Sequence, residues 1–209
     1  MSVGNLFIVM APSGAGKTSL VKALVESEDC NNLRVSVSHT TRKIRPGEIE
    51  GENYHFVDSD TFHEMLQQGA FIENAEVYGH HYGTSQQWVE HQLNSGKDVI
   101  LEIDWQGAGQ VRNAITDACT VFILPPSVDA LRARLTQRGQ DNPETIDQRM
   151  RQVVEEISHV AEADFVVVNS DFAAALEDLA AIFRSQRLTL TYQQTNQAPL
   201  LENLAHSSG

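Results

Sequence analysis

The chain has little of what several classes of protein require. It holds only two cysteines, Cys30 and Cys119, in 209 residues, so neither a disulfide framework nor a cysteine metal cluster is expected. No apolar run approaches the length of about 20 residues that spans a membrane. The N-terminus lacks the basic and apolar segments of a signal peptide. We therefore expect a reduced, cytoplasmic protein that does not insert into a membrane.

Positive charge is also scarce. The chain has 15 lysines and arginines against 28 aspartates and glutamates, which gives a net charge of −13. A protein that binds nucleic acid through phosphate contacts should be basic, so this function is not expected. The few cations gather in two stretches, which could focus positive potential on a small anion or simply line solvated helix faces. They are Arg42, Lys43 and Arg45, and then Arg132, Arg134, Arg138, Arg149 and Arg151.

A glycine-rich stretch near the N-terminus stands out among what is present. Leu6–Met10 is typical of a buried strand, Ser13–Thr18 (SGAGKT) of a tight turn, and the following residues of a helix. This order indicates a phosphate-binding loop, in which backbone N–H groups surround a phosphate. Lys17 would reach the β- and γ-phosphates, and the Thr18 hydroxyl would bind Mg²⁺. Ala11 stands where the pattern has glycine, and the competing interpretation is a glycine-rich turn beside a surface lysine.

Strand and helix patterns alternate along the chain, which indicates an α/β fold. Strands of one parallel sheet with helices on both faces are predicted over residues 6–10, 33–38, 99–103, 120–124 and 165–168. Residues 39–90 interrupt this alternation with a more antiparallel pattern, which includes a strand over 71–77 and a turn over 79–84. A helix is predicted from residue 143 to residue 161. The polar residues 190–209 show no sustained period, which predicts a loosely held tail.

Guanidinium groups and hydroxyls in the interrupting region could converge on one phosphate. The candidates are Ser38, Arg42, Arg45, Tyr54 and Tyr82, although the two tyrosines could also be ordinary half-buried aromatics. Three more arginines follow a core strand on two predicted helices that could fold over the phosphates and neutralise their charge. They are Arg134, Arg138 and Arg149.

Two acids lie where they could recognise a base. Period two places Glu73 on the same strand face as Phe71, Ala75 and Val77, and Asp104 follows the end of a predicted core strand. A carboxylate can accept from the N1–H and the N2 amino group of guanine together. Adenine presents an acceptor at N1, which that carboxylate would repel. A buried acid therefore favours guanine over adenine.

Several stretches together resemble guanylate kinase: SGAGKT at 13–18, SHTTRKIRPGE at 38–48, GENYHF at 51–56, FIE at 71–73, YGT at 82–84, IDWQG at 103–107 and VNSD at 168–171. The resemblance covers residues 4–188. It implies a P-loop NTPase-type three-layer α/β fold with a core (1–38, 91–126 and 156–209), a GMP-binding insert (39–90) and a helical lid (127–155). It also implies Mg²⁺-dependent transfer from ATP to GMP or dGMP in purine nucleotide metabolism, and it leaves a homo-oligomer open.

The resemblance assigns roles by matching position. ATP would be bound by Ala11, Pro12, Ser13, Gly14, Ala15, Gly16, Lys17 and Thr18, with Arg138 and Asn169 flanking adenine. The GMP phosphate would be held by Ser38, Arg42, Arg45, Tyr54 and Tyr82, and guanine would be read by Glu73, Thr84 and Asp104. The transferring group would be stabilised by Lys17, Arg42, Arg134, Arg138 and Arg149. Ala11 and Thr84 depart from the family pattern, which has glycine and commonly serine at these positions.

Two other functions fit parts of this pattern. One is a different P-loop kinase for another small phosphate acceptor, which the run from Thr40 to Glu48 (TTRKIRPGE) argues against. The other is a non-catalytic module of the same fold that binds peptides or phosphoproteins. Such modules typically lack a working ATP loop, whereas Lys17 and the arginines of the predicted lid are present here.

Overall fold

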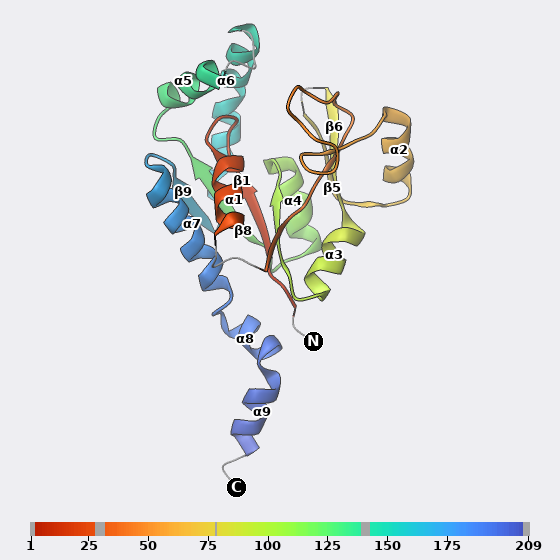
Figure 1. The fold of residues 1–209 in the computed structure, drawn as a ribbon, viewed down its shortest axis with the longest axis vertical. Helices are drawn as coiled ribbons and strands as arrows, with labels where there is room; N and C mark the ends of the chain where they lie inside the picture. The colour runs from red at the N-terminus through yellow and green to blue at the C-terminus, as the bar shows by residue number, and fades with distance from the viewer. Residues whose placement is uncertain (1–2, 28–31, 78, 139–142, 207–209) are drawn as a thin grey trace.

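Five strands form a parallel sheet at the centre of the computed structural model, which describes residues 3–27, 32–77, 79–138 and 143–206 (Figure 1). Their order across the sheet is β2-β7-β1-β8-β9. Apolar residues fill both faces of the middle strands, which explains why these runs are unbroken in the sequence. The strands are β1 (Leu6–Met10), β2 (Leu33–Val35), β7 (Asp98–Glu102), β8 (Cys119–Leu124) and β9 (Phe165–Val168).

Helices cover both faces of this sheet, as the sequence predicts. On one face α1 (Lys17–Glu26) packs against α7 (Phe172–Gln186), and the Phe7 and Phe183 rings stack there with centroids 3.7 Å apart. On the other face lie α3 (Gln86–Asn94) and α4 (Trp105–Ala114). The core therefore has two apolar layers, one on each side of the parallel sheet.

A second, four-stranded sheet stands beside the first and packs against α4 through β5. Its order is β4-β3-β6-β5, and β6 runs antiparallel to both of its neighbours. The elements are β3 (His39–Thr40), β4 (His55–Phe56), α2 (Ser59–Gln67), β5 (Phe71–Val77) and β6 (His80–Ser85). The strand predicted over 33–38 belongs to the first sheet only over 33–35, because the chain then crosses to the second sheet at β3.

The turn predicted over 79–84 is wrong, because most of these residues form strand β6. Two glycines and two histidines weaken the strand signal of this stretch. The residues have little strand preference of their own, and pairing with β5 determines the strand instead. In this pairing Tyr82 lies opposite Ala75 and Thr84 opposite Glu73. The Phe71 ring also lies where a side chain on Gly83 would be, with its atoms 2.9 Å from an ideal Cβ. An aromatic ring on the partner strand thus covers the gap that the glycine leaves.

Two helices rise at the carboxyl ends of the central strands, on the opposite side from the second sheet (Figure 1). They are α5 (Val128–Arg138) and α6 (Pro143–Ser158). Leu131 of α5 and Val153 of α6 are buried in the apolar layer that contains α1 and α7. The helix predicted from 143 to 161 ends at Ser158, and one turn of 3₁₀-helix over His159–Glu162 follows it.

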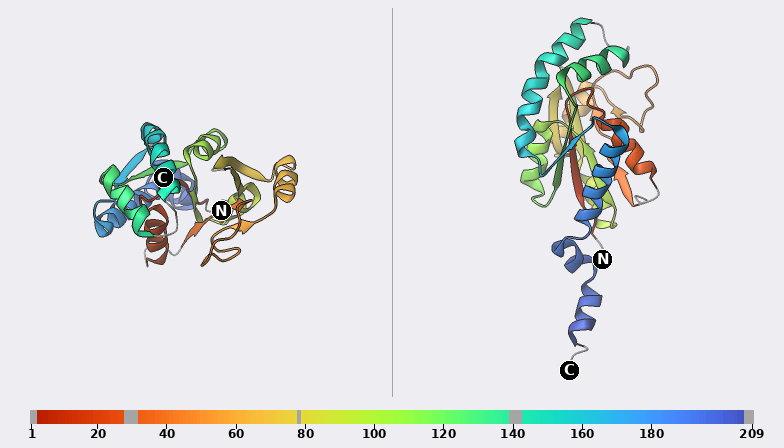
Figure 2. Two further views of the ribbon diagram at one scale, coloured as in Figure 1. Left: turned by 90° about the horizontal axis from the view of Figure 1, so that it is seen from above. Right: turned by 90° about the vertical axis from the view of Figure 1, so that its left-hand side faces the viewer.

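The described part of the tail is helical, although the sequence shows no sustained period there. Helix α8 (Leu190–Asn196) begins at Thr189, whose hydroxyl accepts from the Tyr192 backbone N–H, and α9 (Ala198–His206) follows. Helix α8 lies beside Val3, and α9 extends away from the rest of the molecule (Figure 2). They are short and largely exposed, so an amphipathic period has too few turns to show in the sequence. No helix of the described segments has the length and apolar character needed to cross a membrane.

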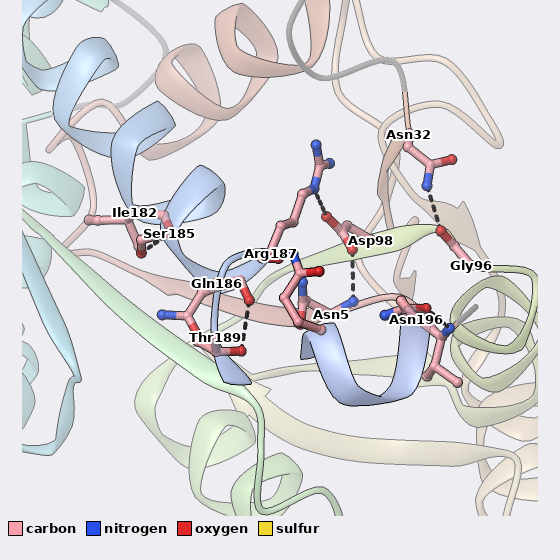
Figure 3. A network of polar contacts seen from close by, with 12 residues as sticks. Asn5, Asn32, Gly96, Asp98, Ile182, Ser185, Gln186, Arg187, Thr189 and Asn196 are labelled. Carbon is pink, nitrogen blue, oxygen red and sulfur yellow. Dashed lines mark hydrogen bonds and ion pairs between the residues drawn. The ribbon is translucent and has the colours of Figure 1, made fainter. Parts of the chain in front are cut away.

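A buried carboxylate at the start of β7 joins the end of α7 to the sheet (Figure 3). Asp98 is fully buried, and its Oδ2 accepts from Arg187 Nε at 2.7 Å while its Oδ1 accepts from the Asn5 backbone N–H at 2.8 Å. Asn196 of α8 bonds in turn to the backbone of Val3. The N-terminal end of the described chain and the end of α8 are thus held near the same edge of the fold.

We expect Arg187→Ala to lower the free energy of unfolding by about 1.5–3 kcal/mol, because a buried carboxylate loses its charged donor. Arg132→Ala is the control, since its ion pair with Asp147 is more than half exposed on both sides and should change stability by about 0–1 kcal/mol. Urea titration of the three proteins measures the difference. Equal midpoints for the two variants would show that the Asp98 pair contributes nothing to stability.

Candidate functional site

The predicted phosphate loop connects β1 to α1 at the carboxyl end of the parallel sheet. Gly14 and Gly16 have φ angles of 90° and 97°, a region that side-chain-bearing residues rarely adopt. Gly16 is also the N-cap residue of α1, so the loop ends where the helix dipole is positive. Strand, loop and helix therefore stand in the arrangement that binds phosphate.

The Ala15 carbonyl is held by two side chains from distant elements. Asn169, which follows β9 and is buried, donates from Nδ2 to the Ala15 oxygen at 2.7 Å. Arg134 of α5 donates from Nη1 to the same oxygen at 3.2 Å and from Nη2 to the Asn169 oxygen at 2.9 Å. A Cβ on Gly16 would lie 2.4 Å from Asn169 Nδ2, so the glycine also makes room for this contact.

Residue Ser13 of the loop contacts α6. Arg149, which is buried, donates from Nη1 to the Ser13 hydroxyl at 3.0 Å, and the Ser13 backbone N–H donates to Glu156 Oε2 at 3.4 Å. Burial raises the pKa of Glu156, against the lowering effects of the Ser13 amide, Lys17 and Arg149. Glu156 received no role from the sequence, although it lies seven residues after Arg149 and so on the same helix face.

The first two residues of α1 face the end of β7. Lys17 Nζ donates to the Ile103 carbonyl at 3.4 Å. The Thr18 hydroxyl donates to Glu102 Oε2 at 2.8 Å. Sequence analysis singled out Asp104 on this segment and missed Glu102, the last residue of the strand. An acid at the end of a strand next to the phosphate-loop strand is the signal that could have identified it.

In the second sheet, Arg42 is the centre of an aromatic and acidic cluster. Its guanidinium makes two hydrogen bonds to Glu48, of 2.7 and 3.0 Å, and lies 5.3 Å from the centre of the Tyr54 ring. Tyr54 packs edge-on against Tyr82. The Arg42 guanidinium holds the pKa of the Glu48 carboxyl below its usual range. Arg45 is exposed and contributes its backbone N–H to Glu48.

A short chain of hydrogen bonds within the second sheet leads to a buried acid. The Thr84 hydroxyl donates to Glu73 Oε1 at 2.5 Å, and Ser38 Oγ lies 3.3 Å from Thr84 Oγ1. Glu73 is 3% exposed, and burial raises its pKa to about 7, with the charge of Asp104 adding to the effect and Thr84 opposing it. Asp104 caps α4 by accepting from the Gly107 N–H at 2.9 Å. The isolated carboxylate of the sequence pattern thus has the partner that its burial requires.

The predicted residues therefore form two groups. Around the phosphate loop lie Lys17, Thr18, Arg134, Arg149 and Asn169, and in the second sheet and at α4 lie Ser38, Arg42, Arg45, Tyr54, Glu73, Tyr82, Thr84 and Asp104. The side chain of Arg138 lies outside the described part of the structure. The acids Glu48, Glu102 and Glu156 contact members of these groups and received no role from the sequence.

Comparison with known proteins identifies related sequences and folds. Residues 3–186 match the family model described as guanylate kinase. The guanylate kinase of Pseudomonas syringae pv. syringae is 56% identical over 96% of this chain and 97% of its own. The guanylate kinase of Alkalilimnicola ehrlichii is 57% identical over 96% of this chain and 98% of its own. The crystal structure of guanylate kinase from Anaplasma phagocytophilum superposes with a TM-score of 0.76 at 33% identity, covering 90% of this chain and 89% of the other.

The raised pKa of Glu73 predicts a pH dependence of stability. Its pKa of about 7 in the folded protein exceeds the usual 4.5, so the folded chain holds a proton that the unfolded chain releases. The stability contributed by protonated Glu73 is complete below about pH 4.5 and is lost as the pH rises through about 7.

We therefore expect the stability of the wild-type protein, relative to Glu73→Gln, to fall by on the order of 2 kcal/mol between pH 5 and pH 8. Urea unfolding of both proteins at each pH measures the difference, which cancels the other titrating groups. A difference that stays constant with pH would place the Glu73 pKa at its ordinary value.

Proposed function

The chain belongs to the guanylate kinase family and phosphorylates GMP with ATP, and we propose the following roles for its residues in that reaction. The observation that carries the proposal is the pairing of a phosphate loop with a buried carboxylate, Glu73, at the end of a hydroxyl chain. The loop suits a nucleoside triphosphate, and the carboxylate suits guanine.

Glu73 reads the base together with Thr84 and Asp104. When ionised, the Glu73 carboxylate accepts from guanine N1–H and from the N2 amino group, whereas the N1 lone pair of adenine faces its charge. The Thr84 hydroxyl fixes one carboxylate oxygen, which leaves the rotamer little freedom. Because Glu73 loses its hydration on burial, a mispaired base leaves a charge without a partner, and this makes discrimination strong.

Arg42, Arg45, Tyr54, Tyr82 and Ser38 hold the phosphate of GMP. Glu48 supports this role of Arg42, because its carboxylate accepts two hydrogen bonds from the guanidinium and stands in for an anion there. Arg45 is exposed and contacts Glu48 only through its backbone, so its guanidinium is available to an entering phosphate. The phosphate of GMP then either binds Arg42 together with Glu48 or displaces Glu48 from Arg42.

Transfer breaks the bond between the γ-phosphorus of ATP and its bridging oxygen and forms one to a phosphate oxygen of GMP. Lys17, Arg42, Arg134, Arg138 and Arg149 neutralise the charge on the group in transit. Arg134 and Arg149 already contact the phosphate loop at Ala15 and Ser13. The rest of the loop, from Ala11 to Thr18, binds the ATP phosphates, and Arg138 and Asn169 flank adenine. Glu156 leaves the Ser13 amide as ATP binds, because a phosphate oxygen needs that donor.

The residues at the start of α1 fit Mg²⁺. The Thr18 hydroxyl and the Glu102 carboxylate are 2.8 Å apart, and both are hard oxygen donors of the kind that this ion prefers. We propose that Thr18 binds the ion and that Glu102 orients Thr18 or a bound water. The ion would supply charge neutralisation at the β- and γ-phosphates.

The proposed division into a core (1–38, 91–126 and 156–209), an insert (39–90) and a lid (127–155) implies rigid-body closure when both substrates bind. The lid contacts the loop through α5 and α6, and the insert contacts the core through α4. We further propose that the enzyme acts in the cytoplasm on GMP and dGMP. Self-association of the enzyme stays a prediction.

We expect Glu73→Gln to raise KM for GMP by about 10- to 100-fold, because the amide turns a donor toward the donors of guanine. A coupled ADP-release assay with GMP, dGMP, AMP and UMP measures it, with AMP and UMP poor acceptors for the wild type. Glu76→Gln is the control, since Glu76 is an exposed acid of the same strand, and its KM should not change. A preference of the wild-type enzyme for AMP would contradict the assignment.

Lys17→Ala should lower kcat by about 10²- to 10³-fold, because it removes a charge that acts on the transferring phosphoryl group. KM for GMP should change little, since Lys17 faces the ATP side. Lys22→Ala tests whether any lysine of α1 matters, as Lys22 is exposed and pairs with the exposed Glu26. Steady-state kinetics with both substrates varied gives the two constants. A large rise in KM for GMP without loss of kcat would place Lys17 at the acceptor instead.

A further inference from the structure

Gly107 lies in the first turn of α4, directly against the buried acid of β5. A Cβ built on Gly107 would stand 2.5 Å from Glu73 Oε2 and 3.1 Å from Glu73 Cδ. Side-chain carbons do not approach other atoms this closely. The carboxylate of Glu73 thus occupies the space that any other residue at position 107 would fill with its own side chain.

The glycine is not needed for the backbone of the helix. Its φ angle is not in the positive range that favours glycine, and its N–H makes the capping bond to Asp104 at 2.9 Å. Glycine inside a helix costs about 0.5–1 kcal/mol relative to alanine. Alanine would therefore suit the local structure of α4 better than glycine. The presence of glycine at position 107 follows from its contact with Glu73.

Glu73 cannot yield to a methyl group without losing its position. Its neighbour Asn74 is joined to α4 by two hydrogen bonds with Gln110, of 2.7 and 3.1 Å. Its other carboxylate oxygen accepts from Thr84 at 2.5 Å. Because β5 is fixed to α4 and the carboxylate is fixed to β6, a Cβ at position 107 would rotate the carboxyl group and break the Thr84 bond.

We propose that Gly107 is a specificity-positioning residue: its missing side chain sets the depth at which the Glu73 carboxylate lies and thereby the selection of guanine. The inference rests on the proposed reading of guanine by Glu73. Gly107 itself touches no substrate in this account and acts only through Glu73. Its removal should therefore alter acceptor recognition and leave the ATP side unchanged.

The chain offers a matched control in the same helix. Gly109 also lies within α4, and a Cβ there would meet nothing within 4 Å. Both Gly107→Ala and Gly109→Ala remove one helical glycine, so an effect of helix propensity is common to the two. Only Gly107→Ala places a methyl group against Glu73.

We expect Gly107→Ala to raise KM for GMP by about 10- to 100-fold, with kcat at saturating GMP and KM for ATP within about threefold of the wild type. The ratio of kcat/KM for GMP over AMP should fall by a similar factor. Gly109→Ala should leave all three kinetic constants unchanged and raise the melting temperature slightly. If Gly107→Ala matches Gly109→Ala in KM for GMP, or if both variants lose GMP binding equally, the inference is overturned.

Glu73→Asp covers the case in which Gly107→Ala does not fold. Shortening the acid by one methylene withdraws the carboxylate from position 107, so the double variant that combines Glu73→Asp with Gly107→Ala should fold. If this double variant also fails to fold, the inference is contradicted. Glu73→Gln, measured in parallel, tests the base reading separately. If that variant binds GMP normally, the proposed role of Glu73 fails; if it is impaired while Gly107→Ala is normal, only the role of Gly107 fails.

Discussion

A loop that directs its N–H groups at a ligand must have its carbonyl groups bonded elsewhere, and this requirement organises the site. In this protein the Ala15 carbonyl accepts from Asn169 behind β9 and from Arg134 of α5. Ser13 contacts Arg149 and Glu156 of α6. The phosphate loop therefore fixes where the helices at the carboxyl end of the sheet must lie. Charges that are far apart in the sequence meet at the loop because they bond to its backbone and side chains.

The side of the site that binds GMP depends instead on a buried carboxylate. Glu73 lies between β6, which supplies the Thr84 hydroxyl, and α4, which supplies an open space at Gly107. Burial alone would leave such an acid protonated at neutral pH. Ionising Glu73 in the free protein is therefore unfavourable. A correctly paired guanine recovers part of this free energy, because its two N–H donors then bind the charged carboxylate. The selectivity for guanine and the unfavourable ionisation of Glu73 in the free protein therefore both follow from the burial of this carboxylate.

Much of the fold could be predicted from the sequence, and the exceptions have physical causes. The central strands are unbroken apolar runs because both of their faces are covered, and Asp58 and Ser85 act as helix caps. Strand β6 has no such pattern, since pairing with β5 and the Phe71 ring over Gly83 determine it. Glu102 and Glu156 had positional signals, a strand end beside the loop strand and the helix face of Arg149, whereas the partner of Glu48 is visible only in the folded chain. The two short helices of the tail have too few turns to show a period, and only α8 had a local signal, the Thr189 cap.

The bonds between Val3 and Asn196 have a topological consequence. The Val3 N–H lies 2.8 Å from Asn196 Oδ1, so the beginning of the first strand and the end of α8 are neighbours in space, although nearly the whole chain separates them in sequence. A short linker across this gap would make the backbone continuous, and new ends could be opened at an exposed turn outside the site, such as the one at Gln68 and Gly69 after α2. The fold thus admits a circular permutation in which the order of synthesis changes while the substrate-binding architecture is retained.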